Sequence, residues 1–91
     1  LDPSTTEKAI SALQLFINVY PESKRVEECN KLIDNLRERL KQKAYELSKL
    51  YFRIEHYKAA IVTMRNAMKD YPDLEQKEEL EFLIVKAYYL Y

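Results

Sequence analysis

The predicted architecture depends on one long segment, SKRVEECNKLIDNLRERLKQKAYELSKLYFRI, residues 23–54. It contains neither Gly nor Pro. Its apolar residues recur at steps of three and four, except that Lys43 stands where the spacing calls for an apolar residue. They are Val26, Cys29, Ile33, Leu36, Leu40, Leu47, Leu50 and Ile54. This spacing is typical of an α-helix that buries one stripe along its length. The sequence therefore predicts a helix from about Ser23 to Ile54, roughly 45 Å long.

Three shorter helices are predicted around this one, at about residues 3–20, 57–70 and 75–90. Tyr20-Pro21 and Tyr71-Pro72 end the first and third of them, because Pro cannot continue a helix. The break before Tyr57 contains no Gly. The whole chain lacks Gly and has three Pro, whereas strands and hairpins depend on Gly for many of their turns. An all-α fold of four helices without strands is the prediction.

Size and charge restrict the class of protein. Ninety-one residues suit one small domain or a fragment of a larger one. Fifteen basic and 15 acidic residues give no net charge, which disfavours a nucleic-acid binder. No apolar run has the length of a signal peptide or a membrane span. The single Cys29 lies on the apolar stripe and is predicted to be a buried small hydrophobe, so it does not indicate a redox compartment.

The chain contains an internal repeat. At a shift of 51 positions, Tyr20-Pro21-Glu22 matches Tyr71-Pro72-Asp73. At a shift of 37, residues 49–52 (KLYF) match residues 86–89 (KAYY). The two shifts differ by two heptads, or about four helical turns. The long helix is therefore interpreted as an ordinary repeat helix that is extended at its start.

The repeat length and its helical pairs indicate tetratricopeptide (TPR) architecture. The spacing of the TPR signature is met by Ala44, Leu47, Ser48, Tyr51, Ala60, Met64, Ala67 and Pro72. Ala44 and Ser48 stand where that signature has Trp and its first Gly. Ala60 is predicted to be buried where two helices approach closely, because a larger side chain would clash there.

No catalytic or metal-binding pattern is present in the sequence. His56 is the only His and Cys29 the only Cys, and they belong to different predicted helices or turns, so a Cys–His pair, a His-based triad and a zinc site all lack parts. Without Gly there is no phosphate-binding loop. The chain is predicted not to be an enzyme and to have no cofactor.

The candidate working surface is a repeated aromatic–Lys–aromatic pattern. The first copy consists of Tyr45, Lys49 and Phe52, with Arg53 alongside. The second copy, at the shift of 37, consists of Phe82, Lys86 and Tyr89. These helix positions usually face the concave groove in TPR proteins, where they suit docking of a peptide or a partner helix. The alternative is that the aromatic rings pack between repeats while the Lys ammonium groups extend into solvent.

Charge is distributed unevenly along the chain. Basic residues are in excess near the end of the long helix: Arg37, Arg39, Lys41, Lys43, Lys49 and Arg53. Acidic residues are in excess between Asp73 and Lys86. One interpretation is that the basic region meets an acidic partner. The other is that the two regions neutralise each other within the fold or between copies of the chain.

Several of these stretches together resemble the carboxy-terminal half of the BamD family. They are Tyr20-Pro21-Glu22-Ser23, the extended helix through residues 36–40 (LRERL), residues 50–52 (LYF), residues 57–61 (YKAAI) and residues 69–73 (KDYPD). The resemblance covers nearly the whole chain. It implies a TPR scaffold of the outer-membrane β-barrel assembly machine, at the periplasmic face of the outer membrane. It also implies protein partners, namely the barrel subunit, other subunits of the machine, or substrate peptides.

The same resemblance implies that the full-length parent is lipid-anchored through an N-terminal Cys outside this chain. Cys29 lies inside a predicted helix and is not that residue. Three alternatives remain open. They are another periplasmic TPR adaptor, serving cell-envelope division or the Tol-Pal system, a generic peptide-binding co-chaperone module, and a hydrolase whose catalytic domain lies elsewhere.

Overall fold

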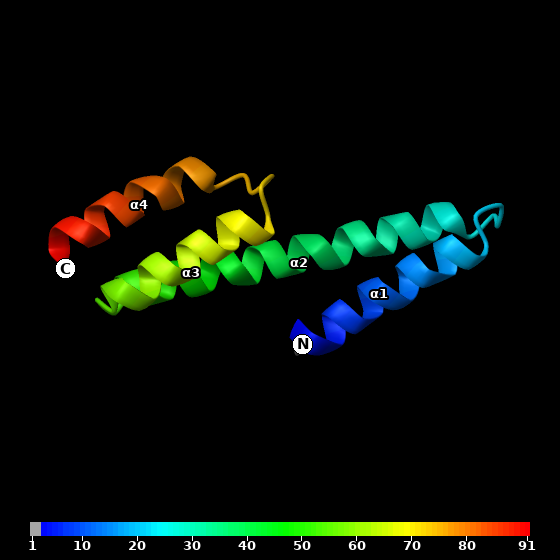
Figure 1. Cartoon of the computed structure of the whole chain (residues 1–91), viewed down its shortest axis with the longest axis horizontal. Helices are drawn as coiled ribbons and strands as arrows, with labels where there is room; N and C mark the ends of the chain where they lie inside the picture. Colours follow the sequence, from blue (N-terminus) through cyan, green and yellow to red (C-terminus); the bar gives the residue numbers. More distant parts are fainter. Residues whose placement is uncertain (1–2) are drawn as a thin grey trace. The chain divides into compact units, whose positions relative to one another are not determined.

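The computed structural model of the chain describes residues 3–91 and consists of α-helices joined by short turns (Figure 1). The helices are α1 (Pro3–Val19), α2 (Val26–Arg53), α3 (Tyr57–Asp70) and α4 (Lys77–Leu90). Within residues 3–91 there is no strand. The predicted all-α fold with four helices, one of them unusually long, is confirmed.

The helix α2 begins at Val26 and not at Ser23, where the sequence predicted its start. The reason is a hydrogen-bonded turn that follows α1. The Ser23 N–H donates to the Tyr20 carbonyl (3.1 Å), and the Ser23 Oγ accepts from the Arg25 N–H (3.1 Å). The Cys29 N–H then donates to the Arg25 carbonyl at 2.9 Å, as in a regular α-helical turn. Ser23 therefore stabilises the turn before the helix and does not cap the helix itself.

The same turn occurs a second time between α3 and α4. The Leu74 N–H donates to the Tyr71 carbonyl (3.0 Å), and the Leu80 N–H donates to the Gln76 carbonyl (3.0 Å). These bonds repeat those of the first turn at the longer of the two shifts seen in the sequence. They also explain why α4 begins at Lys77 and not near Glu75.

The turn between α2 and α3 is a Schellman motif. Glu55 has a φ of 65°, in the left-handed region that usually favours Gly or Asn. The His56 N–H donates to the Tyr51 carbonyl (2.9 Å), and the Glu55 N–H donates to the Phe52 carbonyl (3.1 Å). These two bonds satisfy carbonyls that the end of α2 leaves without helical partners. The chain thus reverses here without a Gly, at the cost of one unfavourable backbone conformation.

The chain divides into two compact units, the first ending at Leu40 and the second running from Lys41 to Tyr91. In the first unit, α1 and the beginning of α2 form a helical hairpin (Figure 1). Cys29 and Ile33 are buried on α2, as predicted, and Thr6 is buried on α1. The rings of Phe16 and Tyr20 pack against each other with centroids 5.1 Å apart.

The second unit has its core around α3. The fully or nearly fully buried residues of this core are Ala60, Met64, Ala67, Leu74 and Leu80. The end of α2 packs against them through half-buried side chains, among them Tyr51 and Phe52. Ala60 has no exposed surface, which agrees with the close helix approach predicted for it.

The buried side of α2 differs from the predicted stripe in this second unit. Leu47, Leu50 and Ile54 were predicted to be buried, but they are 44%, 39% and 46% exposed. Ser48 is fully buried instead. A polar residue is tolerated there because the Ser48 Oγ donates to the Ala44 carbonyl at 2.8 Å. Near this end of α2 the small Ser48 is thus buried, whereas Leu47, Leu50 and Ile54 keep much of their surface exposed.

Candidate functional site

The first copy of the aromatic–Lys–aromatic pattern meets α4 at Glu79. The Tyr45 Oη donates to Glu79 Oε1 at 2.6 Å, and the Lys49 Nζ donates to Glu79 Oε2 at 2.6 Å. The Lys49 Nζ also donates to the Tyr45 Oη at 3.2 Å and lies 5.1 Å from the centre of its ring. Both oxygens of one carboxylate thus hold two side chains of α2 that are one turn apart.

This arrangement changes the pKa values of both charged groups. The hydrogen bonds that Glu79 accepts from Lys49 and from Tyr45 lower the pKa of its carboxyl below the ordinary value of 4.5. The hydrogen bond to Glu79, followed by the one to Tyr45, raises the pKa of the Lys49 ammonium above 10.5. Both groups are therefore charged at neutral pH, and the cluster acts as a structural link between α2 and α4.

Phe52 packs inside the second unit, whereas Arg53 is exposed. The Phe52 ring meets the Tyr57 ring edge to face, with centroids 5.5 Å apart, and contacts the core. Arg53 is the last residue of α2. The Tyr45 and Phe52 rings are thus both half-buried against the core of the second unit.

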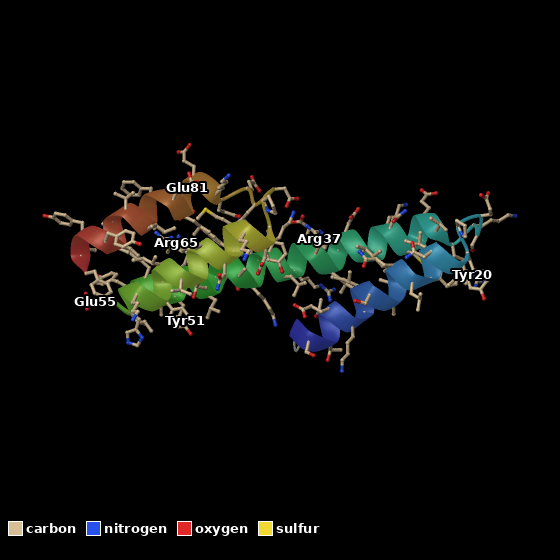
Figure 2. The ribbon with its side chains drawn as sticks, in the orientation of Figure 1. Tyr20, Arg37, Tyr51, Glu55, Arg65 and Glu81 are labelled. Carbon is tan, nitrogen blue, oxygen red and sulfur yellow. The ribbon has the colours of Figure 1, made fainter. Side chains whose placement is uncertain are left out.

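The second copy of the pattern lies on the outside of α4. Phe82 is 63% exposed, Tyr89 is 88% exposed, and Lys86 is exposed beside them. Val85, which the sequence analysis did not single out, adds to this surface because it lies between them on the same side of the helix. We call Phe82, Val85, Lys86 and Tyr89 the α4 face. Glu81 borders it and points outward from α4 (Figure 2).

The two oppositely charged regions of the sequence meet within the second unit. The Lys41 Nζ lies 2.6 Å from Asp73 Oδ2, and Lys49 pairs with Glu79. Two of the basic residues predicted to attract an acidic partner are thus paired inside the fold. This favours the interpretation in which the regions neutralise each other, at least for these two residues.

A shallow hollow of about 710 Å³ lies where α2 turns into α3. Its lining is mainly apolar and comes from residues on both sides of that turn and from the residue that follows α4. Among the lining residues are Tyr51, His56, Tyr57, Lys58, Val62 and Tyr91. The sequence analysis did not predict this hollow. A signal for it was the cluster of Tyr residues on either side of a turn that has no Gly.

None of the site residues described above forms a metal site. Among residues 3–91 there is no group of three or more His, Cys, Asp or Glu residues placed to hold a metal ion. Cys29 is buried and His56 is exposed. No helix in this part of the chain is both long enough and apolar enough to cross a membrane.

The repeated turns, the paired helices and the small residues at their crossing define a helical-repeat protein of the tetratricopeptide type. Its most exposed aromatic side chain, that of Tyr89, lies on the last of these helices. A family model described as YfiO, outer membrane lipoprotein, matches residues 1–91, and the chain therefore belongs to this family. The predicted resemblance to the BamD family and the outer-membrane localisation are confirmed. A comparison with curated proteins found no match.

Proposed function

We propose that this chain is a non-catalytic TPR scaffold of the outer-membrane β-barrel protein assembly machinery. In this role it docks other subunits of the machine, the barrel subunit among them, at the periplasmic face of the outer membrane. The membership of the chain in the family of outer membrane lipoproteins supports this location at the outer membrane. The alternative of an unrelated periplasmic TPR adaptor has no such support.

The docking role is supported by the exposure of the α4 face. Exposed aromatic residues scattered singly are ordinary, but Phe82, Val85 and Tyr89 form a continuous apolar strip along one side of a helix. Aromatic residues are enriched among the side chains that dominate protein–protein binding energies. Lys86 within the strip adds a positive charge that a carboxylate on the partner would complement.

The proposal is tested by replacing the strip in the full-length parent. We expect the double substitution Phe82→Ser and Tyr89→Ser to lower the recovery of the barrel subunit in co-purification by about tenfold or more, because one strong aromatic contact contributes about 1.4 kcal/mol or more. Tyr20→Ser is the matched control, since Tyr20 is also exposed but lies in the first unit. Recovery that is equal for both variants and the wild type would overturn the α4 face as the docking surface.

A second candidate function, capture of substrate peptides, is favoured by the hollow at the α2–α3 turn. Its apolar lining and its volume of about 710 Å³ suit one or two large side chains of a peptide. Val62→Glu would place a charge on its wall. We expect this variant to lose binding of unfolded barrel-protein peptides, measured by fluorescence anisotropy, while it retains the co-purification described above. Unchanged peptide binding would remove this candidate.

A further inference from the structure

The side of α4 that carries the α4 face begins one turn before Phe82, at Glu78. Glu78, Phe82 and Lys86 follow one another at intervals of four residues, so they lie on one side of the helix, and all three are exposed. Val85 and Tyr89, which are 65% and 88% exposed, lie beside them on the same side. This side of α4 therefore combines an acidic residue near its start, a basic residue two turns later and apolar residues around them.

The charges of Glu78 and Lys86 are not matched within the part of the chain that the structure describes. Among residues 3–91, neither side chain takes part in an ion pair or a hydrogen bond. The two residues are eight positions apart on one helix, whereas side chains on a helix surface meet at separations of three or four. Both charges are thus available to a second molecule.

The first copy of the aromatic–Lys–aromatic pattern shows what kind of group suits Lys86. At the shift of 37, Lys86 corresponds to Lys49 and Phe82 corresponds to Tyr45. Lys49 donates to the Glu79 carboxylate of a neighbouring helix at 2.6 Å. The equivalent contact for Lys86 is therefore a carboxylate on a helix that lies against the α4 face.

A second copy of α4 supplies such a carboxylate at the right position. If two α4 helices lie side by side in opposite directions around a two-fold axis next to Phe82, residues at equal distances before and after Phe82 come opposite each other. Glu78 precedes Phe82 by four residues and Lys86 follows it by four. Lys86 of each copy then meets Glu78 of the other copy, and the two Phe82 rings meet at the axis. Such a contact is isologous, the commonest kind in homodimers.

Electrostatics favours this direction of pairing over the opposite one. The chain has no net charge, so two copies do not repel each other at long range. A parallel pairing in register would place Lys86 against Lys86 and Glu78 against Glu78, which costs free energy. The charges of α4 therefore select the antiparallel pair, while Phe82, Val85 and Tyr89 supply the apolar area.

We propose that the α4 face pairs with the α4 face of a second copy of the chain, antiparallel, through two Lys86–Glu78 ion pairs on either side of Phe82. A contact between single helices is smaller than the roughly 1,200–2,000 Å² of a stable interface, so the pairing is weak and depends on concentration. It does not rest on the proposed function. Where both hold, a second copy and the barrel subunit compete for the α4 face.

The test measures self-association of the 91-residue chain by sedimentation equilibrium, between about 10 µM and about 1 mM protein. We expect a monomer–dimer equilibrium for the wild type. Lys86→Glu and Glu78→Lys should each raise the dimer dissociation constant by about tenfold or more, because the two-fold axis repeats every like-charge contact. Both positions are exposed and both residue types are good helix formers, so the variants keep their fold, which circular dichroism checks.

The decisive sample is an equimolar mixture of the Lys86→Glu and Glu78→Lys variants. It should associate like the wild type, because each variant supplies the charges that the other one lacks. Lys77→Glu is the matched control, since Lys77 is also exposed on α4 but lies off this side of the helix, and we expect it to associate like the wild type.

A wild-type chain that stays monomeric at all these concentrations would overturn the inference. So would a dimer that neither reversal weakens, a mixture that fails to associate, or an equal loss in the Lys77→Glu control. The charge variants retain Phe82 and Tyr89, and they are measured without the barrel subunit. A failure of self-pairing is therefore distinct from a failure of the docking role.

Discussion

Lys49 and Glu79 lie on different helices, and their Nζ and Oε2 atoms are 2.6 Å apart in the fold. The pair joins the second half of α2 to the first turn of α4. Lys49 was predicted to be part of a docking surface, but its charge is already matched within the chain. Reversing that charge would disturb the fold as well as any partner, so Lys86 on α4 is the cleaner position for a binding test.

The Lys49–Glu79 pair predicts a dependence of stability on pH. The lowered pKa of Glu79 stabilises the fold above pH 4.5, and this contribution is lost as the pH falls through the folded-state pKa. The pKa of Lys49 is raised, so its contribution to stability is lost at high pH and not at low pH. The contribution is complete below pH 10.5 and is lost as the pH rises through the folded-state pKa. The pair therefore stabilises the fold between these two limits.

We expect Glu79→Gln to lower the free energy of unfolding at pH 7 by about 0.5–1 kcal/mol, a modest value because both side chains are well exposed to solvent, at 38% and 40%. The difference from the wild type should shrink as the pH falls below 4.5 and through the lowered folded-state pKa of Glu79, because the carboxyl is then protonated. Urea denaturation at pH 7 and at a series of acidic pH values measures the difference. Glu78→Gln, an exposed neighbour, is the control, and an equal effect of the two substitutions would contradict the role of the pair.

The left-handed conformation of Glu55 predicts a stabilising substitution. Gly adopts a φ of 65° without steric cost, so Glu55→Gly should raise the free energy of unfolding by up to about 1 kcal/mol. The same substitution at Glu81, inside α4 and exposed, should lower it by about 1 kcal/mol. Thermal melting followed by circular dichroism checks both. A loss of stability at position 55 would mean that Glu55 is not the left-handed residue of the turn.

The complete burial of Ala60 predicts that this site does not accept a larger side chain. Ala60→Leu should cost about 1–3 kcal/mol, because the added methylene and methyl groups would overpack the contact of α3 with its neighbours. Ala12→Leu is the matched control, since Ala12 is exposed on α1. That control substitution should change the stability by less than about 0.5 kcal/mol. Equal melting temperatures for Ala60→Leu and the wild type would show that the TPR register is wrong.

The exposure of Leu47 predicts a contrast between two Leu→Ala substitutions. Leu80 is fully buried in the core, so Leu80→Ala should cost about 2–5 kcal/mol. Leu47→Ala removes an exposed side chain and should cost less than about 1 kcal/mol. Denaturant titration of the two variants measures the difference. Losses of unfolding free energy of similar size would place Leu47 on the buried side of α2, as the spacing of apolar residues alone predicted.

The helical class, the four helices and the TPR register follow from the amino-acid sequence alone. The absence of Gly excluded most strand and hairpin geometry, and Tyr20-Pro21 and Tyr71-Pro72 marked two helix ends, because the local backbone chemistry of these residues does not depend on the rest of the fold. Ala60 and Met64 were also assigned correctly to the core, since the TPR spacing specifies where helices cross.

Two features depend on tertiary packing: which side of α2 is buried near its end, and which of the two aromatic–Lys–aromatic patterns stays exposed. Leu47 and Ser48 are neighbours on one helix, and apolarity alone favours burying Leu47. The fold buries the small Ser48 instead, and its hydroxyl is satisfied within α2 by the Ala44 carbonyl. Likewise Tyr45 and Phe82 have equivalent places in the sequence repeat. They differ in the fold because Glu79 of α4 lies against Tyr45, while the side of α4 that carries Phe82 is exposed.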